Sequence, residues 1–336
     1  MNSRSMEYSE TRAFGMLGLS HGLASNNRAL IHNPDFFERG KIYTQLANWE
    51  KLETLDYRPG MDSYCYLLDD PALPYEITYN PRELRIQGDL SQLEIDGIDY
   101  RWSLLGNVGI WFRFVLAVQE QHGIFSLHAS SIYKPEQEEL LIIAGKAGAG
   151  KTVYLLESLL SGYQIFSTEM TYFQLTGEGV VFYRGALLDN IRVGCFLYDF
   201  PEVSDLLGVS VPDVDHPWEA KINVSMHSAT TERGSLTNPK ISIIFPHIDS
   251  GIEHAVVSDI SNPRTLTRML FENASEKIGS TMLLYETLPA VGFDTTMLAR
   301  ARWKAVAELV AAPNWQIKQA RTILACPKSC LEVIDE

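Results

Sequence analysis

A glycine-rich turn between an apolar run and a helix-forming run constrains this chain more than any other feature. The run Leu140 to Ala144 is short and apolar, which predicts a buried strand. The turn that follows reads Gly145-Lys146-Ala147-Gly148-Ala149-Gly150 and ends in Lys151-Thr152. The next run has one apolar face, formed by Leu155, Leu156, Leu159 and Leu160. The whole stretch therefore matches the pattern GxxxxGK[ST] in the strand–loop–helix context that phosphate binding requires.

The residue types explain how such a loop would bind a nucleotide. Glycines let the backbone curl so that several N–H groups point at one anion, and the following helix adds the positive end of its dipole. Lys151 is expected to contact the β- and γ-phosphates, and Thr152 to offer its hydroxyl to Mg²⁺. Lys146 can lie along the phosphates or point to solvent, and the second is favoured. The expected nucleotide-binding set is Gly145, Lys146, Ala147, Gly148, Ala149, Gly150, Lys151 and Thr152.

Composition limits the partners that such a chain can have. The chain has 336 residues, 46% of them hydrophobic, and a net charge of −14, which argues against general binding to nucleic acid or to anionic membranes. Its four cysteines form no CxxC pair, its first residues lack the apolar core of a signal peptide, and no run approaches the ~20 apolar residues of a spanning helix. A cytoplasmic protein is therefore expected, and the sequence leaves a homo-oligomer open.

Two regions are expected along the chain. Residues 1–122 form a β-rich region, with short strands that include YRWSLL at 100–105 and with one apolar helix at about 107–121. Residues 123–336 form a nucleotide-binding domain, in which 201–217 is expected to be a loop. Further expected elements are helices at 262–278 and 295–312 and a late strand at 315–320. Strands on both sides of one strand–loop–helix unit predict an α/β protein with a mixed sheet.

Other classes of phosphate-loop protein can be tested against the sequence. A guanine-nucleotide switch would carry an [NT]KxD base reader, but the nearest string, Asn238-Pro239-Lys240, has the wrong order. A mechanical ATPase commonly ends a strand in an aspartate that holds Mg²⁺ through water. Asp199, near the end of FLYDF, could have that role, although the proline at position 201 favours a turn there.

From Leu127 to Phe173 the chain resembles the HPr kinase/phosphorylase superfamily, which are phosphate-loop kinases of the phosphoenolpyruvate-carboxykinase-like fold. The string LHASSIYKPEQEELLIIAGKAGAGKTVYLLESLLSGYQIFSTE carries the resemblance. His128 falls at the family's strand histidine, and Gly162 at its glycine after the helix. Ser167-Thr168-Glu169 falls where the family has a small residue followed by Asp-Asp. The resemblance implies an α/β kinase core with a mixed sheet and a β-rich N-terminal part beside it.

The strand end departs from the family pattern. In the family the first aspartate acts as a base toward the acceptor hydroxyl, and the second helps to hold Mg²⁺. Here the first position is Thr168, whose hydroxyl cannot act as a general base at neutral pH. Glu169 could hold the metal or act as the base, and His128 could supply the base or be a buried, hydrogen-bonded histidine. Loose phosphoryl-transfer transition states also need little help from a base.

Two hypotheses follow from these residues. The first is an ATP- and Mg²⁺-dependent phosphotransferase that moves the γ-phosphoryl group to a hydroxyl of a small molecule or peptide, with Glu169, His128 and Lys151 as catalytic residues. Thr152 and Glu169 are then the expected metal ligands, and Arg184 and Arg192 are weaker substrate-side candidates, with Lys221 and Lys240 weaker still. The second is a nucleotide-binding regulatory or scaffold protein with weak ATPase activity, which the threonine at position 168 favours.

Overall fold

A computed structural model gives the fold of most of the chain. It describes residues 8–32, 53–92, 100–106, 109–146, 148–249, 251, 254–279, 282–284, 288–290, 292–311 and 317–325. The protein is mixed α/β and divides into two compact units. Unit 1 contains residues 1–123 and 275–300, and unit 2 contains 124–274 and 301–336. The first boundary lies next to the one expected at 122/123, whereas the return of 275–300 to unit 1 was not foreseen.

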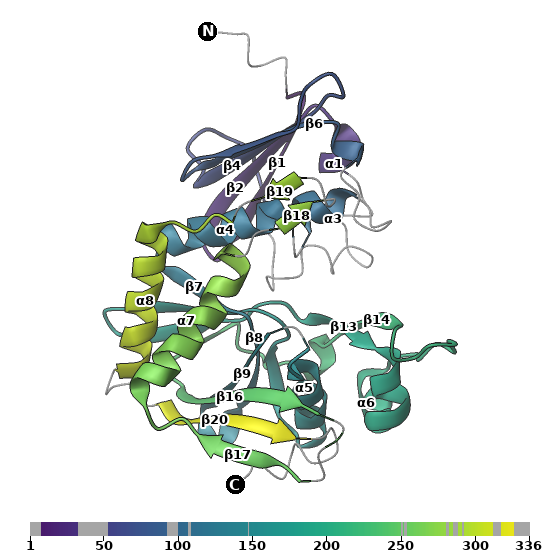
Figure 1. The fold of residues 1–336 in the computed structure, drawn as a ribbon, viewed down its shortest axis with the longest axis vertical. Coiled ribbons are helices and arrows are strands. Elements are labelled where there is room, and N and C mark those ends of the chain that lie inside the picture. Colours follow the sequence, from purple (N-terminus) through teal and green to yellow (C-terminus); the bar gives the residue numbers. More distant parts are fainter. Residues whose placement is uncertain are drawn as a thin grey trace. The chain divides into compact units, whose positions relative to one another are not determined.

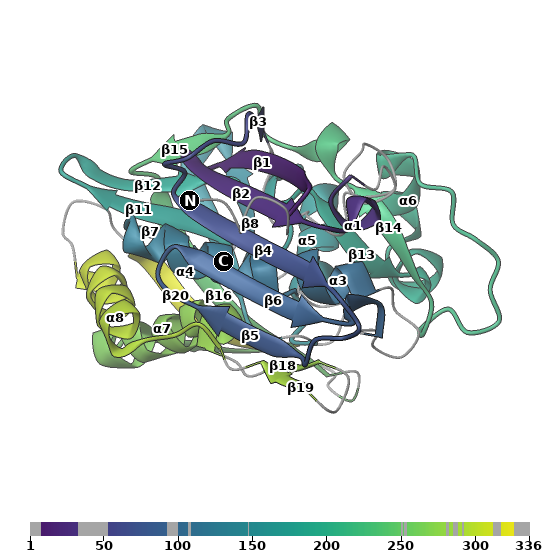
Figure 2. The same cartoon turned by 90° about the horizontal axis from the view of Figure 1, so that it is seen from above.

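Unit 1 is built on a six-stranded sheet with the order β3-β1-β2-β4-β6-β5, which is seen from above in Figure 2. Hairpin β1–β2 turns at Leu17 and Gly18, both of which have positive φ. Buried and half-exposed residues alternate along β4, as expected for a strand with one covered face. The strands are β1 (Glu10–Met16), β2 (Leu19–Ser25), β3 (Glu53–Leu55), β4 (Ser63–Asp69), β5 (Glu76–Tyr79) and β6 (Glu83–Gly88).

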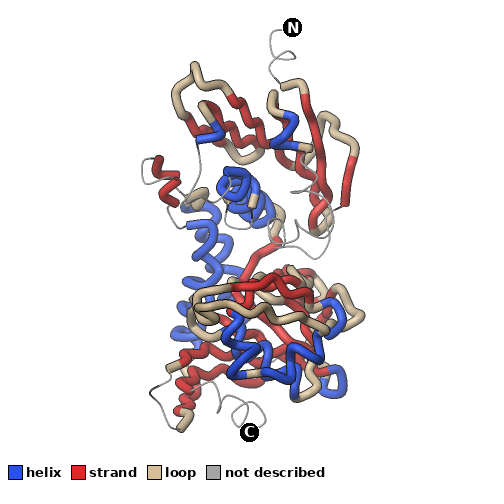
Figure 3. Tube along the Cα trace, turned by 90° about the vertical axis from the view of Figure 1, so that its right-hand side faces the viewer, coloured by secondary structure: helices blue, strands red, loops and turns tan. Residues whose placement is uncertain are grey.

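The helix expected at 107–121 is confirmed as α4 (Ile110–Gln121), and it packs on this sheet. Its Trp111 ring lies 6.0 Å from the Phe14 ring of β1, and Trp111 is fully buried. Figure 3 shows this helix, in blue, against the red strands of unit 1. The strand expected at 100–105 is wrong, because this segment is helix α3 (Tyr100–Leu105). Unit 1 also contains the short helix α1 (Arg28–Ile31) and the hairpin β18 (Met282–Leu284)–β19 (Leu288–Ala290).

Unit 2 is built on a second six-stranded sheet, with the order β10-β8-β9-β16-β20-β17 (Figure 1). The apolar run before the glycine turn forms β9, which pairs parallel with β16 and antiparallel with β8. Both faces of β9 are buried, which explains why its sequence is apolar without alternation. The strands are β8 (Ala129–Lys134), β9 (Glu139–Ala144), β10 (Gln164–Ser167), β16 (Lys240–Ile248), β17 (Val256–Asp259) and β20 (Ile317–Ala325).

Two apolar cores lie on the two faces of this sheet. One face is covered by helix α5 (Lys151–Leu160), whose Tyr154, Leu155 and Leu156 pack against Leu141 and Ile143 of β9. The other face is covered by helices α7 (Pro263–Gly279) and α8 (Thr296–Ala311) and by a four-stranded sheet, β15-β12-β11-β7. The strands of that sheet are β7 (Ile124–Leu127), β11 (Thr171–Thr176), β12 (Gly179–Tyr183) and β15 (Ser235–Thr237). The helices expected at 262–278 and 295–312 are confirmed as α7 and α8.

A two-stranded ribbon, β13 (Leu188–Arg192) with β14 (Lys221–Ser225), belongs to neither large sheet. Between its strands lie a π-helical turn, Cys195–Asp199, and helix α6 (Pro201–Leu207). The expected loop at 201–217 is therefore wrong over its first seven residues. Pro201 occupies the first turn of α6, and Gly208 caps it in the left-handed conformation.

None of the helices in the described parts of the chain has both the length and the apolar character that crossing a membrane requires.

Candidate functional site

The glycine turn connects β9 to α5 and follows a backbone path that only glycine can take at two positions. Gly148 has φ +81° and Gly150 has φ +102°. A Cβ atom at Gly150 would lie 2.1 Å from Cγ1 of Ile248, at the end of the neighbouring strand β16. A larger residue at position 150 would therefore clash with β16, and its backbone would be strained at this positive φ. Ala147 lies outside the described residues.

Lys151, the first residue of α5, folds back over the turn. Its Nζ donates to the carbonyl of Gly145 at 2.7 Å and to that of Lys146 at 3.2 Å. The ammonium thus lies at the mouth of the turn, where it would meet an anion held by the N–H groups. The side chain of Lys146 is exposed, as favoured from the sequence.

The sheet topology brings the expected His128 and Glu169 to the same edge as the turn. Strand β8 is antiparallel to both β9 and β10, so its start lies beside the ends of both. His128 immediately precedes β8 at the bend from β7, and Glu169 follows the end of β10. His128 Nε2 lies 3.9 Å from Glu169 Oε1, with the histidine buried and the glutamate part-exposed. In addition, Asn273 of α7 donates to the backbone carbonyl of His128 at 3.0 Å, which anchors the bend.

Asp189 is a further acidic residue at this edge, and reasoning from sequence missed it. It lies near the start of β13, and its Oδ2 accepts a hydrogen bond of 3.1 Å from Oγ1 of Thr152. Burial, together with the charge of Glu169, raises the pKa of Asp189 to about 6. The Thr152 hydroxyl, the Asn190 backbone N–H and the Lys151 ammonium partly oppose that rise. The glycine turn therefore has a carboxylate next to the hydroxyl of the threonine that follows it.

The spacing of the two oxygens was tested against the expected metal. Mg²⁺ binds six oxygens octahedrally at about 2.1 Å, so two adjacent ligand oxygens lie about 3 Å apart. The distance of 3.1 Å between Thr152 Oγ1 and Asp189 Oδ2, which are hydrogen-bonded in this structure, is close to that spacing. In the parts of the chain that are described, no three His, Cys, Asp or Glu side chains come together as a metal site on their own. Mg²⁺ sites commonly complete their shell with phosphate oxygens and water, so two protein oxygens fit this ion.

Thr168, where the resemblance led us to expect an aspartate, has a side chain with a structural role. Its hydroxyl lies 2.7 Å from the carbonyl of Leu188 and 3.0 Å from that of Ala186. Its backbone N–H donates to the Ala186 carbonyl at 2.9 Å. The strand end is thereby tied to the segment that carries Asp189. Position 185, in the same segment, accepts only glycine, because a Cβ atom there would lie 1.9 Å from the carbonyl oxygen of Met170.

The two arginines suggested for the substrate side do not join this cluster. Arg184 is only 9% exposed, and its guanidinium donates to Thr230 Oγ1 at 3.1 Å and to the Thr231 carbonyl. Arg192 donates to the Trp218 carbonyl. Because side chains alternate along a strand, Arg192 also lies on the opposite face of β13 from Asp189. Both arginines therefore hold loops in this structure.

Three weaker candidates also lie away from the turn. Lys240 begins β16 and pairs with Glu139, so it lies at the opposite end of the parallel strands from the turn. Lys221 pairs with Arg192 at the far end of the ribbon from Asp189. Asp199 ends the π-helical turn rather than a strand, so the strand-end geometry expected of a water-mediated Mg²⁺ ligand is missing.

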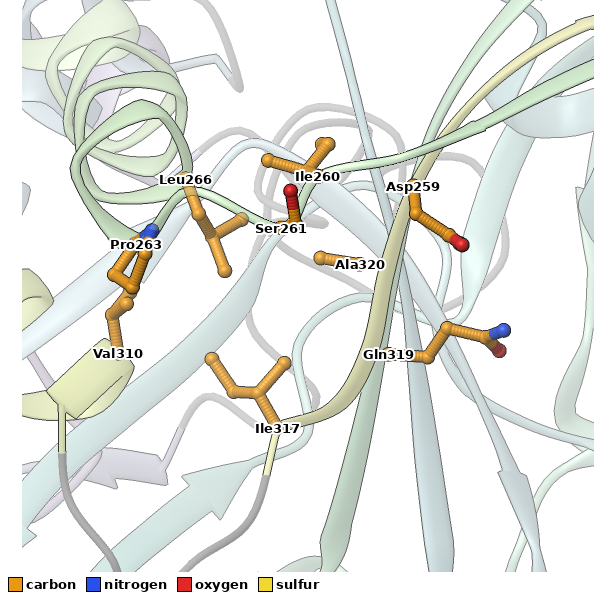
Figure 4. Close-up of a pocket in the computed structure, with 9 residues that line it drawn as sticks. All are labelled: Asp259, Ile260, Ser261, Pro263, Leu266, Val310, Ile317, Gln319 and Ala320. Atoms are coloured by element: carbon orange, nitrogen blue, oxygen red, sulfur yellow. The ribbon is translucent and has the colours of Figure 1, made fainter.

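A pocket of about 380 Å³ lies elsewhere in unit 2. Its lining comes from β17, α7, α8 and β20, and includes Ile260, Leu266, Val310 and Ile317 (Figure 4). Ile317 is at the start of β20, so the pocket lies near the amino ends of the parallel strands, whereas the glycine turn lies at their carboxyl ends. Asp259, its acidic lining residue, pairs with Arg321 at 3.1 Å.

Comparison of the chain with protein-family models and with curated protein sequences finds no match.

Proposed function

We propose that unit 2 is an ATP- and Mg²⁺-dependent phosphotransferase of the HPr kinase-like type, acting on a hydroxyl of a small molecule or peptide. The observation that carries the proposal is the 3.1 Å contact between the hydroxyl of Thr152 and the carboxylate of Asp189. It puts an anionic oxygen beside the loop threonine, where a nucleotide-dependent kinase needs a place for its metal. Thr152 and Asp189 would hold Mg²⁺, which when bound neutralises charge on the phosphates.

This assignment changes the role of Glu169. With Asp189 beside Thr152, Glu169 is no longer needed as a metal ligand and becomes the base. The acceptor oxygen forms a bond to the γ-phosphorus while the bond from that phosphorus to the β–γ bridging oxygen breaks. The acceptor's proton passes to Glu169, and ADP leaves with the bridging oxygen. His128, 3.9 Å from Glu169, would orient that carboxylate and balance its charge when protonated.

Lys151 has the remaining role. Its ammonium would exchange the carbonyls of Gly145 and Lys146 for oxygens of the β- and γ-phosphates. This exchange replaces two neutral acceptors with anionic ones, so a Coulombic attraction between opposite charges is added to each hydrogen bond of the ammonium. The threonine at position 168 favoured the alternative of a regulatory protein with weak ATPase activity, because it left Glu169 as the one carboxylate expected at the site. Asp189 supplies a second carboxylate, so this argument for the alternative no longer applies.

The test is transfer of label from γ-labelled ATP with Mg²⁺ to a metabolite extract and to a peptide extract. We expect label on an organic acceptor, and we expect Glu169→Gln to lower its rate by about a hundredfold or more, the usual contribution of a general base. The variant should keep its stabilisation by ATP. Glu178→Gln, in the exposed β11–β12 turn, is the matched control and should behave as the wild type. Release of free phosphate alone, at a rate unaffected by Glu169→Gln, would instead support the regulatory alternative.

A further inference from the structure

The segment between the two strands of the ribbon is unusual in charge. Residues 195–219, here called the acidic lobe, contain six acidic residues and neither lysine nor arginine. The acids are Asp199, Glu202, Asp205, Asp213, Asp215 and Glu219. Figure 1 shows the lobe, with α6, beyond the β13–β14 ribbon and beside α5. A run of acids without counter-charges in the same segment creates a local negative field that attracts cations.

The acidic lobe has apolar residues on two sides. Phe196, Phe200 and Val203 are buried and pack with the α5 core. Leu197 and Tyr198, in the same π-helical turn, are exposed, at 43% and 57%. The inward residues already attach the lobe to the core, so the outward ones are not needed for that purpose. Large exposed apolar side chains that adjoin one another commonly mark an interaction site.

The acidic lobe carries an exposed aromatic pair near its base. The rings of Tyr198 and Trp218 lie 5.8 Å apart, and Trp218 is 46% exposed. The Trp218 ring lies over Gly194, where a Cβ atom would come within 2.5 Å of it. Gly194 N–H in turn donates to the carbonyl of Pro217 at 2.8 Å, which holds the base of the lobe closed. A rigid aromatic pair loses little conformational entropy when it binds, which is the property of a good anchor.

The lobe and the phosphate site are joined by one strand. Asp189 is near the start of β13, and Gly194 follows its end, five positions later. At about 3.3 Å per residue this is roughly 16 Å. An extended peptide anchored at Tyr198 and Trp218 could therefore reach the phosphate site with about five residues.

From these observations we propose that the acidic lobe docks a basic peptide segment of the phosphoryl acceptor, with a bulky apolar side chain against Tyr198 and Trp218. The proposal rests on the proposed function and narrows its acceptor to a peptide. The negative field repels nucleic acid and anionic lipid, and the net charge of −14 disfavours a second copy of this chain. The six acids of the lobe complement a segment rich in Lys or Arg, and the exposed aromatic pair complements a bulky apolar side chain.

The experiment uses three pools of fluorescent 15-residue peptides, each with one serine, and the full chain. The first pool has Lys or Arg with Phe or Leu about five residues from the serine. The second replaces the basic residues by Asp or Glu, and the third replaces Phe and Leu by Gly. Fluorescence anisotropy should show the first pool binding at least about tenfold more tightly than either of the others, because both charge and apolar anchor contribute. Its affinity should also fall as salt is raised.

Two tryptophans of equal exposure supply the matched variants. Trp218→Ala should weaken binding of the first pool by about tenfold or more. Trp303→Ala, on α8 and also 46% exposed, should leave it unchanged. Asp213→Asn with Asp215→Asn should weaken binding and reduce its salt dependence, without loss of ATP-induced stabilisation.

The outcomes separate this proposal from the function on which it rests. Equal binding of the three pools, or equal binding by Trp218→Ala and wild type, overturns the docking surface whatever the transfer assay shows. Self-association that Trp218→Ala abolishes also overturns it, since the occupant is then a second copy. If the first pool binds at the lobe but no label is transferred from ATP, the docking surface stands and the phosphotransferase proposal falls.

Discussion

Replacing Asp189 by asparagine tests two effects of this buried carboxylate: that its charge destabilises the protein alone, and that the same charge is needed to bind Mg²⁺ with ATP. The asparagine side chain has nearly the shape of the protonated acid and can still accept the hydrogen bond from Thr152. It cannot become negative beside Glu169. We therefore expect Asp189→Asn to stabilise the protein alone at neutral pH and to lose stabilisation by Mg²⁺ and ATP.

The size of the effect follows from the raised pKa. The carboxyl titrates near 3.8 when exposed and at about 6 in the fold. The fold therefore favours the protonated acid, and the stability that this proton contributes is present below pH 3.8 and is lost as pH rises through 6. A difference of about two in pKa corresponds to about 3 kcal/mol, an upper figure because the site can relax. At pH 7 the variant should gain up to that amount, and at pH 4 almost none.

Urea unfolding of wild type and Asp189→Asn from pH 4 to pH 8, without metal or nucleotide, measures this difference. The gap between the two free energies of unfolding should open between about pH 4 and pH 6 and then stay constant. Asp213→Asn, an exposed aspartate of the acidic lobe, is the control and should show a much smaller gap. A gap at Asp189 that is independent of pH, or a variant less stable than wild type at pH 7, would refute the account of this carboxylate.

Four further predictions test the loop and its supports. Lys151→Ala should abolish the rise in melting temperature that Mg²⁺ and ATP cause in wild type. A rise of the same size in the variant would contradict the assignment of the loop. Gly150→Ala should destabilise the fold by more than about 1 kcal/mol in urea unfolding, because its Cβ would contact Ile248, and an unchanged midpoint would contradict the observed path of the turn. Thr168→Val should lower transfer more than Thr168→Ser, since only serine keeps the hydroxyl bond to the Leu188 carbonyl. Thr168→Asp, which would create the Asp that the resemblance led us to expect, should reduce transfer because its carboxylate would face that carbonyl, and a rise in transfer would show that the position is catalytic.

The local parts of the site could be predicted from sequence. The strand before the glycine turn and the helix after it follow from residues close together in the chain, whereas His128, expected on a strand, lies at the bend between β7 and β8. Helices α4, α7 and α8 were also found, because long apolar periodic runs are a strong signal. Segment 100–105 was wrongly expected to be a strand because its aromatic residues favour strands, and tertiary context overrode that preference.

Asp189 could not be found in the same way. It reaches Thr152 across 37 positions of the chain, and its sequence neighbours show no motif that the sequence analysis could use. The sequence does contain signals for helix α6, namely a proline at its start and a glycine after its end. The prediction of a loop at 201–217 did not take them into account. The place of the two arginines could not be predicted for a related reason. An arginine that binds phosphate and one that holds a loop have the same sequence signature, and only their partners in the fold distinguish them.

Among the described strands, β13 and β14 pair only with each other, and β13 carries Asp189 and leads into the acidic lobe. Because one strand connects the two places, a ligand bound at Asp189 can change the free energy of binding at the acidic lobe, and the reverse also holds. Thermodynamic linkage requires that change to be mutual: if a docked peptide tightens Mg²⁺ and ATP binding by some factor, the nucleotide tightens peptide binding by the same factor. Under the proposed function, such linkage would make the presence of the acceptor a condition for tight binding of ATP, which would limit hydrolysis of ATP without transfer.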